Sequence, residues 1–591
     1  MDYKTYFAKH PGWPYKNFAQ MLAGIARSYG DATAFRIRSA DRDEGYEVLT
    51  FREVESMARS LARFFIASGF RAGDTVAVYS ENRPEWCICY LAAVSIGLVA
   101  VPLDTALDEQ GASNILTASS ARAVVYSGRQ REKALAAVSS SAVPGLLLID
   151  LDRVDDGAVS GVAASGGAFE LSFQRILAAP PEAELPDPDS ISGDATAAII
   201  FTSGTTGVAK GIVLSHAGIL ANMEASVRAL RVDRRDTILS VLPLHHTYAT
   251  TCTFLAPLEA GCSVTFVEKI VPSVVVRHIE ESRVTVLIGV PLLFDKIRAG
   301  IETELRKLPA VVGRVLHILI GVSRFLTVQC GTDAGRYLLG FLRKKAGLDS
   351  LRLCVSGGGP LQPATADFFD ALGFRLVQGY GMSENGPLIS VNLPMYKDNR
   401  SVGVPVWKTE VRIANPGPDE IGEIQVHSPS LMKGYLNDPE AALVAFTPDG
   451  WLRTGDLGRI DGRGFIYITG RSKDIIVTEG GKNVYPEEIE QRFSDSPWIA
   501  EILVLGRKRS EGHSGEDVVA LCFPDYERIR SSHPGREGDP DFVRSLVRND
   551  ILRVNKSLPP YMKVVDFRIS ETEFEKTSTR KIKRFLYKNS I

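Results

Sequence analysis

A stretch rich in glycine and small hydroxyl residues, at residues 202–211, carries the clearest chemistry in the sequence. It reads Thr-Ser-Gly-Thr-Thr-Gly-Val-Ala-Lys-Gly and lies between two apolar runs, residues 197–201 and 212–214. Glycines let backbone N–H groups approach a phosphate closely, because no side chain blocks the path. Lys210 adds a positive charge. The stretch therefore predicts a phosphate-binding loop that follows a buried strand.

The spacing of this loop differs from that of a Walker A motif. That motif needs G-x-x-x-x-G-K-[ST], whereas here Gly204, Gly207 and Gly211 are spaced differently and Lys210 precedes a glycine. An ordinary glycine-rich turn between two strands is the alternative. The loop alone does not decide between the two.

Two later apolar runs also end in glycine-rich turns, at residues 356–360 and 378–384. In open α/β sheets, ligands bind at the carboxyl ends of the strands. Tyr380 in the second turn offers an aromatic face for stacking. Glu384 offers the hard oxygen ligands that suit Mg²⁺. These turns predict a second part of a nucleotide site.

In their order along the chain and in their residues, the three turns resemble the motifs of the adenylate-forming superfamily, which contains acyl-CoA synthetases, adenylation domains and luciferases. Further matches lie at residues 433–435, which are assigned no chemistry, and at residues 451–458, 470–474 and 480–486. The resemblance spans roughly residues 15 to 590. Residues 81–86 and a helical insertion at about 299–349 are most similar to the long-chain fatty acid–CoA ligases.

The resemblance implies a binding site for ATP, Mg²⁺ and CoA. Gly357, Gly358 and Tyr380 would flank the adenine, and Asp456 would accept hydrogen bonds from the ribose hydroxyls. Glu384 would bind the metal. The implied cofactor-binding residues are Thr202, Ser203, Gly204, Thr206, Gly207, Gly357, Gly358, Gly379, Tyr380, Gly381, Ser383, Asp456, Arg471, Lys473, Gly480 and Gly481.

The resemblance also implies the catalytic residues, which are Thr205, Lys210, Glu384 and Lys581. Lys581 would bridge the acid and the α-phosphate, Lys473 would be the hinge, and Gly480 and Gly481 would meet the pantetheine of CoA. The family has glycine before this catalytic lysine and proline earlier in the motif, where this sequence has Arg580 and Glu575. These departures put the conformation of the lysine loop in question, and a plain basic tail is the alternative.

The implied substrate residues are His246 and Gly381. A histidine after a buried strand is often a core residue, but in the family the corresponding turn borders the acyl pocket. The implied reaction has two steps. A carboxylate first attacks the α-phosphorus of ATP and releases pyrophosphate, and the CoA thiol then displaces AMP. Rotation of the C-terminal domain about Lys473 would exchange the surfaces that serve the two steps.

The pattern of the chain predicts an α/β fold. Strand-like and helical segments alternate over residues 15–150, which favours a largely parallel sheet covered on both faces. A capping box is expected at Thr50 and an N-cap at Ser215. Residues 155–193, rich in Gly, Ala, Ser and Pro, are expected to form a surface excursion.

The expected architecture has two domains. Residues 1–472 would form an N-terminal ATP- and acyl-binding domain of parallel-sheet α/β subdomains with a small β-barrel and the insertion at about 299–349. Residues 473–591 would form a small mobile α+β domain that carries the catalytic lysine. A chain of 591 residues is long enough for two or more domains.

Composition narrows the function class. The formal net charge is −2, which gives no indication of nucleic-acid binding. Seven scattered cysteines without a C-x-x-C pair favour a reducing compartment and argue against a cysteine metal site. The first residues lack the apolar core of a signal peptide. A cytoplasmic location is expected, with the inner face of a membrane as a site of peripheral contact.

Two segments bear on membrane contact. Residues 86–103 contain no charged side chain, and this segment is long enough to span a membrane. Gly97 and Pro102 nevertheless favour a buried helix followed by a buried strand. The insertion at 299–349 mixes basic and bulky apolar residues. It could rest on an anionic membrane, but a solvated helical hairpin packed on the body is the preferred interpretation.

Several alternatives remain for the function. Long-chain fatty acids are the preferred substrates, and an aryl or medium-chain acid is the alternative. The acyl acceptor is expected to be CoA, with a free carrier protein as the alternative. A non-enzymatic binding or scaffold protein is disfavoured, because Lys210, Glu384, Asp456, Arg471 and Lys581 are all retained. The oligomeric state is left open.

Overall fold

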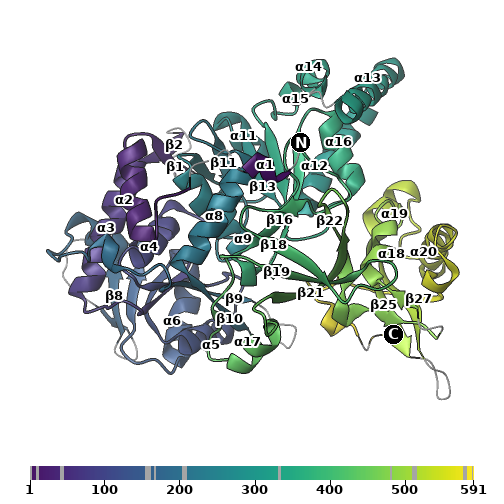
Figure 1. The fold of residues 1–591 in the computed structure, drawn as a ribbon. Coiled ribbons are helices and arrows are strands. Elements are labelled where there is room, and N and C mark those ends of the chain that lie inside the picture. Colours follow the sequence, from purple (N-terminus) through teal and green to yellow (C-terminus); the bar gives the residue numbers. More distant parts are fainter. Residues whose placement is uncertain are drawn as a thin grey trace. The chain divides into compact units, whose positions relative to one another are not determined.

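The computed structural model describes residues 3–7, 12–39, 45–153, 162–164, 168–202, 209–330, 334–479, 482–508, 515–576, 582–588 and 590. The chain divides into two compact units (Figure 1). The large unit contains Met1–Glu410 and His427–Leu452, and the small unit contains Val411–Val426 and Arg453–Ile591. The predicted domain boundary between residues 472 and 473 stays a prediction.

Two nine-stranded sheets form the frame of the large unit, and their central strands are parallel, as the alternating pattern predicts. The first sheet has the order β17 (Val404–Pro405), β16 (Leu388–Val391), β15 (Arg375–Gly381), β14 (Leu353–Ser356), β13 (Val286–Gly289), β11 (Thr237–Ser240), β12 (Ser263–Phe266), β1 (Thr33–Arg38) and β2 (Tyr46–Thr50). The second sheet has the order β20 (Gly434–Tyr435), β10 (Lys210–Ser215), β9 (Thr196–Thr202), β4 (Val99–Pro102), β3 (Thr75–Tyr79), β5 (Ala121–Tyr126), β6 (Leu147–Asp150), β8 (Ala168–Ser172) and β7 (Val162–Ala164).

Helices connect these strands. Their bounds are α1 (Tyr3–Phe7), α2 (Phe18–Tyr29), α3 (Phe51–Ala67), α4 (Pro84–Val94), α5 (Glu109–Ser119), α6 (Arg131–Ser140), α7 (Phe173–Ala178), α8 (His216–Leu230), α9 (Thr247–Ala249), α10 (Ala256–Glu259), α11 (Pro272–Glu281), α12 (Pro291–Arg306), α13 (Ala310–Cys330), α14 (Ala334–Leu338), α15 (Gly340–Lys345), α16 (Pro363–Ala371) and α17 (Pro439–Ala445).

Local sequence signals account for several of these boundaries. The Thr50 side chain accepts from the Glu53 backbone while Glu53 reaches back to Thr50, so the expected capping box begins α3. Ser215 caps α8 as expected, since its side chain accepts a hydrogen bond from the Gly218 N–H. The uncharged run at residues 86–103 forms buried α4 and then buried β4, as expected, with a turn at Gly97.

The segment at residues 155–193 differs from the prediction. Residues 154–161 and 165–167 lie outside the described residues, but β8 pairs in parallel with β6 and extends the sheet. Glu170 on β8 is buried and accepts hydrogen bonds from Tyr126 and Arg131. The prediction of a surface excursion is therefore wrong for β8 and for α7, whose Phe173 is also buried.

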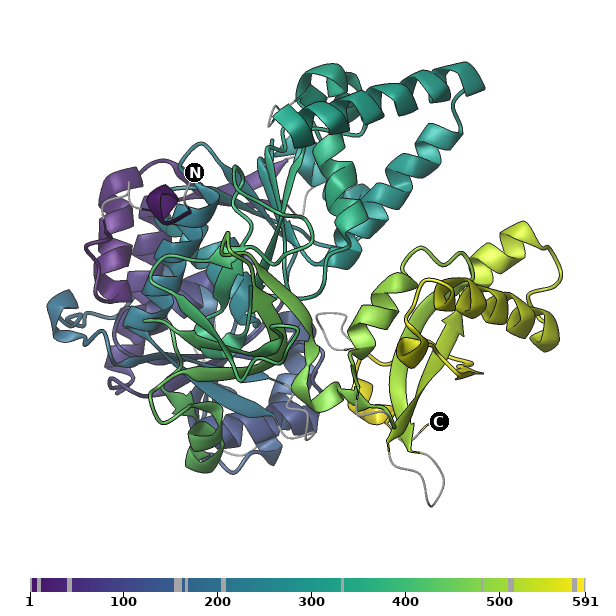
Figure 2. The ribbon, with the colours of Figure 1, turned by 45° about the vertical axis from the view of Figure 1, so that its right-hand side comes forward.

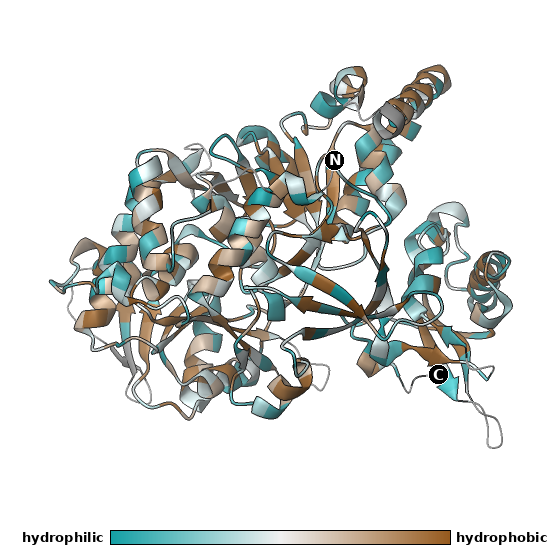
Figure 3. Ribbon diagram, in the orientation of Figure 1, coloured by the Kyte–Doolittle hydropathy of each residue, from teal (hydrophilic) through white to brown (hydrophobic). Residues whose placement is uncertain are grey.

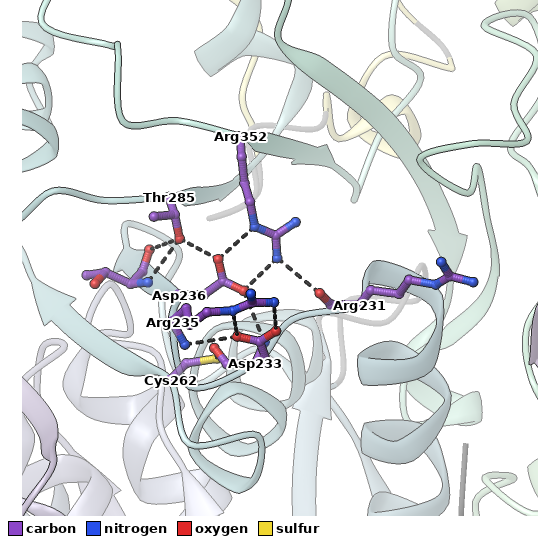
Figure 4. A network of polar contacts seen from close by, with 8 residues as sticks. Arg231, Asp233, Arg235, Asp236, Cys262, Thr285 and Arg352 are labelled. Carbon is purple, nitrogen blue, oxygen red and sulfur yellow. Dashed lines mark hydrogen bonds and ion pairs between the residues drawn. The ribbon is translucent and has the colours of Figure 1, made fainter. Parts of the chain in front are cut away.

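A polar network joins the amino ends of three neighbouring strands in the first sheet (Figure 4). Arg352, just before β14, donates to both carboxylate oxygens of Asp236, just before β11, at 2.7 and 2.5 Å. Thr285, just before β13, donates to Asp236 at 2.7 Å. A charged hydrogen bond of this kind is stronger than a neutral one, so this edge of the sheet is firmly held.

The small unit is an α+β structure. It includes a four-stranded sheet with the order β18 (Glu410–Ala414), β19 (Gly422–His427), β21 (Leu452–Ile460) and β22 (Ile466–Arg471), within the residues 1–472 for which a small β-barrel was expected. The other elements are β23 (Ile476–Val477), β24 (Asn483–Val484), α18 (Pro486–Arg492), β25 (Ile499–Lys508), β26 (Glu516–Pro524), α19 (Tyr526–Ser532), α20 (Pro540–Asn555) and β27 (Asp566–Ile569). Val547, Ile551 and Val554 of α20 pack into the core beside β25 and β26.

Candidate active site

The predicted phosphate loop connects two antiparallel strands. Thr202 at the end of β9 pairs with Lys210 at the start of β10, so the strands hold the two ends of the loop opposite each other. Ser203, Gly204, Thr205, Thr206 and Gly207 lie outside the described residues. Thr202, Ala209, Lys210 and Gly211 are therefore the described members of this motif.

Lys210 lies beside an aromatic ring and a carboxylate. Its Nζ is 5.1 Å from the centroid of the Tyr435 ring and 3.7 Å from Oδ2 of Asp438. The side chain is about one-third exposed. A lysine held in this way keeps its charge accessible to an anionic ligand while the ring limits where the ammonium group can lie.

Glu384 belongs to the same cluster. It lies in a short 3₁₀ turn, Ser383–Asn385, after β15, and its Oε1 accepts a hydrogen bond of 2.9 Å from the Tyr435 hydroxyl. Burial, and then the Glu384 charge, raises the pKa of Tyr435 well above its usual value of 10. The phenol therefore stays protonated and remains a donor at neutral pH.

Tyr435 thus lies between the two charged residues of the site, Lys210 and Glu384. Sequence reasoning assigned it no chemistry. Its position comes from β20, a strand of two residues that pairs with β10 through Ile212 and Tyr435. The only signal in the sequence was the match of residues 433–435 to a family stretch, which said nothing of the contact.

Buried amides hold the Glu384 turn in place. Asn222 on α8 donates to the carbonyls of Asn385 and Leu388, at 3.0 Å each, and accepts from the Leu388 N–H at 3.0 Å. Ser428 donates to the Asn385 side chain at 2.6 Å. Because these groups are buried, losing one partner would leave the other unsatisfied. The turn therefore presents Glu384 from a rigid base.

The chemistry of Glu384 fits a divalent cation. Its Oε1 takes the Tyr435 hydrogen bond, and no described residue makes a hydrogen bond or ion pair with its Oε2. Carboxylate oxygens are the usual protein ligands of Mg²⁺, which otherwise keeps waters and substrate phosphates. Glu384 can therefore serve as a metal ligand of a bound Mg–nucleotide.

The two glycine-rich turns leave neighbouring strands. Ser356 at the end of β14 pairs with Gln378 of β15, so the turns begin side by side at the carboxyl edge of the sheet. Gly379 and Tyr380 then pair with β16, opposite Val391 and Ser390. The structure thus brings the predicted adenine-binding turns together.

Close packing explains two of these glycines. A Cβ at Gly357 would lie 2.8 Å from the ring of Tyr248, and a Cβ at Gly381 would lie 2.1 Å from the Pro387 carbonyl oxygen. Neither leaves room for a side chain. Gly358 has a φ of +78°, which a residue with a side chain rarely adopts.

His246 lies in a small cluster at the carboxyl ends of β4 and β11. Its ring is 4.2 Å from the ring of His245, whose Nε2 is buried 3.3 Å from Asp104 Oδ2 without the alignment of a hydrogen bond. Among the described residues, these are the one group of three candidate metal ligands. The predicted place of His246 beside the acyl pocket stays a prediction.

A second set of predicted residues lies in the small unit. Asp456 on β21 faces Arg471 on β22, and Arg471 Nε lies 3.0 Å from Asp456 Oδ1. Asp456 is buried, so the guanidinium fixes its carboxylate. Lys473 follows in a 3₁₀ turn, Ser472–Asp474, and burial, then the Arg471 charge, lowers its pKa.

Lys581, Arg580, Gly480 and Gly481 lie outside the described residues, but the segments flanking residues 577–581 are well anchored. Lys576 pairs with Glu501 and forms an isolated bridge with Ile582. Beyond residue 581, Arg584 donates to both oxygens of the partly buried Glu490 carboxylate, at 2.8 and 2.9 Å. The described residues on either side of 577–581 are therefore held in the small unit.

Comparison with known proteins gives consistent results. The family profile described as "AMP-binding enzyme" matches residues 22–436. Long-chain-fatty-acid–CoA ligase FadD15 of Mycobacterium bovis is 28% identical over 91% of this chain and 90% of its own length. 4-Coumarate–CoA ligase 3 of Oryza sativa is 28% identical over 86% of this chain and 83% of its own. The crystal structure of ATP-bound MatB from Rhodopseudomonas palustris superposes with a TM-score of 0.72 and 26% identity, covering 97% of this chain and 99% of that one.

Proposed function

The chain belongs to the AMP-binding family of adenylate-forming enzymes, and we propose that it is an ATP-dependent acyl-CoA ligase whose acid substrate is a long-chain fatty acid. The observation that carries this proposal is the cluster of Lys210, Tyr435 and Glu384. It combines an accessible cation with a carboxylate that can bind a metal. Binding a nucleoside triphosphate requires both, because its phosphates are negatively charged.

The reaction would begin with adenylation. A carboxylate is a poor acyl electrophile because its oxygen is a bad leaving group. Its oxygen attacks the α-phosphorus of ATP, the bond from that phosphorus to pyrophosphate breaks, and a mixed anhydride with AMP forms. Such a transfer depends on positioning and charge neutralisation. Lys210 would bind the leaving phosphates, and Glu384 would hold Mg²⁺, whose charge offsets theirs.

The second step would form the thioester. The sulfur of CoA attacks the carbonyl carbon of the anhydride, the bond from that carbon to the AMP oxygen breaks, and AMP leaves with the electron pair. Lys581 would serve the first step, and Gly480 and Gly481 would serve the second. Asp456 and Arg471 would hold the ribose through both, since their contact at 3.0 Å presets the carboxylate.

The preference for a long-chain acid rests on similarity. Residues 81–86 and the helical insertion resemble long-chain ligases, and a long-chain ligase is among the relatives that match over most of both chains. The 4-coumarate relative matches at the same identity and supports an aryl acid as a second candidate. At 28% identity, neither name decides the acid.

The test is CoA-dependent AMP formation with a panel of acids: acetate, octanoate, palmitate, oleate, benzoate and 4-coumarate. Highest kcat/KM with palmitate or oleate is the expected result. A maximum with benzoate or 4-coumarate would keep the ligase activity and overturn the choice of acid. Pyrophosphate release without any CoA-dependent AMP would point to a carrier protein as the acceptor.

A further inference from the structure

The helices α12 and α13 extend from the sheet region of the large unit as consecutive long helices (Figure 2). α13 is the one described helix that is long and apolar enough to cross a membrane, yet only 11% of its apolar window is buried. Figure 3 shows the hydrophobic colouring along this helix. The preferred expectation, a solvated hairpin packed on the body, does not account for this exposure.

Most of the exposed apolar side chains of α13 lie on one face, and Val312, which is also exposed, lies outside that row. Val311, Val315, Ile318, Val322 and Phe325 recur at intervals of four and three residues, which places them in a single row on a helix. We call this row the apolar stripe. Its members are 45% to 73% exposed. Removing such side chains from water is favourable, so the stripe favours an apolar partner.

The opposite face of α13 is attached to the protein. Ser323 is fully buried and donates to the Ala371 carbonyl at the end of α16, at 2.6 Å. Arg324 pairs with Asp367 on α16 at 2.6 Å. Leu316 is also buried. The apolar stripe therefore faces away from the large unit, and lipid could not surround α13 on all sides as it surrounds a membrane span.

Positive charge accompanies the stripe. Exposed cations without a described ion-pair partner lie on and around α13 at Arg306, Arg314, Arg336, Lys344 and Lys345. The carboxylates described within residues 300–349 are each paired: Glu302 with Arg298, Glu304 with Lys307, and Asp349 with Arg283. The exposed surface of this segment is therefore basic.

Aromatic residues complete the surface. Tyr337 on α14 is 85% exposed, and Phe341 on α15 is also exposed. Tyrosine prefers the boundary between lipid and water, because its ring is apolar and its hydroxyl is polar. Apolar, basic and aromatic side chains thus occur together in one segment of the chain.

We propose that α13 docks on an anionic lipid bilayer, lying parallel to the membrane surface with the apolar stripe in the acyl boundary and the cations among the headgroups. The negative charge of such a surface attracts each nearby Lys and Arg. A second copy of the chain is a poorer partner, because it would place the same cations against one another. The inference does not depend on which acid the enzyme activates.

The test is flotation of the full-length protein with vesicles of phosphatidylcholine alone and of an equal mixture of phosphatidylcholine and phosphatidylserine. The wild-type protein is expected to float with the mixed vesicles and to be released by salt. Ile318→Asp/Phe325→Asp is expected to lower the bound fraction at least about tenfold, with octanoate-dependent or acetate-dependent AMP formation unchanged. Lys344→Glu/Lys345→Glu is expected to weaken binding to the mixed vesicles.

Matched control variants distinguish binding through this surface from non-specific binding of the protein to vesicles. Leu443→Asp removes an exposed leucine on α17, and Lys556→Glu/Lys563→Glu reverses two exposed lysines in the small unit. Both are expected to float like the wild type. The proposal is overturned if the wild type does not bind mixed vesicles, if control and stripe variants bind equally, or if Ile318→Asp/Phe325→Asp dissociates a dimer without changing flotation.

Discussion

The hydroxyl of Tyr435 donates a hydrogen bond of 2.9 Å to Oε1 of Glu384, from a strand only two residues long. Tyr435→Phe removes that bond and keeps the ring beside Lys210. A hydrogen bond to a charged group is worth about 1.5–3 kcal/mol. We therefore expect pyrophosphate release at limiting Mg²⁺ to fall about tenfold or more, and to recover in excess Mg²⁺.

The measurement is pyrophosphate release as a function of Mg²⁺ concentration. Tyr467→Phe is the matched control, because this tyrosine donates to Asp461 away from the predicted residues. An equal fall at all Mg²⁺ concentrations would mean that Tyr435 supports packing and does not position the carboxylate.

Gly357→Ala tests the turn after β14. The new methyl group would lie 2.8 Å from the Tyr248 ring, so one of the two must move. We expect kcat/KM for ATP to fall on the order of 10- to 100-fold, since small displacements in a site are costly. Gly359→Ala, whose nearest neighbour would lie 3.7 Å away, is expected to be almost neutral. Equal effects of the two substitutions would contradict the packing argument.

Glu259 on α10 predicts a pH effect on stability. Burial, and then the Glu224 carboxylate, raises the pKa of Glu259 to about 8. The folded protein therefore holds a proton that the unfolded chain releases above its ordinary pKa, and stability falls as pH rises from about 4.5 to 8. We expect Glu259→Gln to remove a penalty of a few kcal/mol at most.

The measurement is Tm of wild type and Glu259→Gln at pH 5 and at pH 8.5. The advantage of the variant should appear at the higher pH and vanish at the lower one. An advantage of the same size at both pH values would assign the effect to packing.

Lys473→Pro tests the predicted hinge. Proline fixes φ near −65° and removes a backbone donor, so rotation about this residue would be restricted. We expect adenylation, followed as pyrophosphate release, to persist, while thioester formation falls at least about tenfold. Lys473→Ala removes the charge without fixing φ, so it should not reduce thioester formation more than adenylation. Equal loss of both steps in the proline variant would rule out the hinge.

Lys581→Ala tests the predicted catalytic lysine. We expect adenylation to fall on the order of 10²-fold or more, because a charge that stabilises the transition state is lost. Thioester formation from a supplied acyl adenylate should continue. A variant with normal adenylation would support the alternative, in which the C-terminal basic residues form only a tail.

Local signals predicted much of the fold. The capping box at Thr50 and the uncharged run at residues 86–103 each specify an element through neighbours in the chain, and both predictions are confirmed. The segment around β8 was misread, because its burial depends on β6 and on the pairing of Glu170 with Arg131. Composition cannot reveal a partner that is distant in sequence.

In the site, too, local signals predicted some residues, while contacts between distant residues were missed. The turns that bear Gly357 and Glu384 were identified from their glycines and from their place after apolar runs. The role of Tyr435 was missed, since a strand of two residues has no periodicity and its contacts come from β10 and the Glu384 turn. The hydrogen bond by which Ser323 attaches α13 to α16 likewise could not be predicted from the hydropathy of the sequence.

The Arg352–Asp236 network at the amino ends of β11, β13 and β14 has an evolutionary consequence. It holds the first sheet at the edge opposite the turns that carry Gly357, Glu384 and His246. Mutations in those turns can therefore accumulate without loosening the frame. Selection for a new acid would then act on the turn that carries His246, which is predicted to border the acyl pocket, while the amino edge of the sheet remained constant.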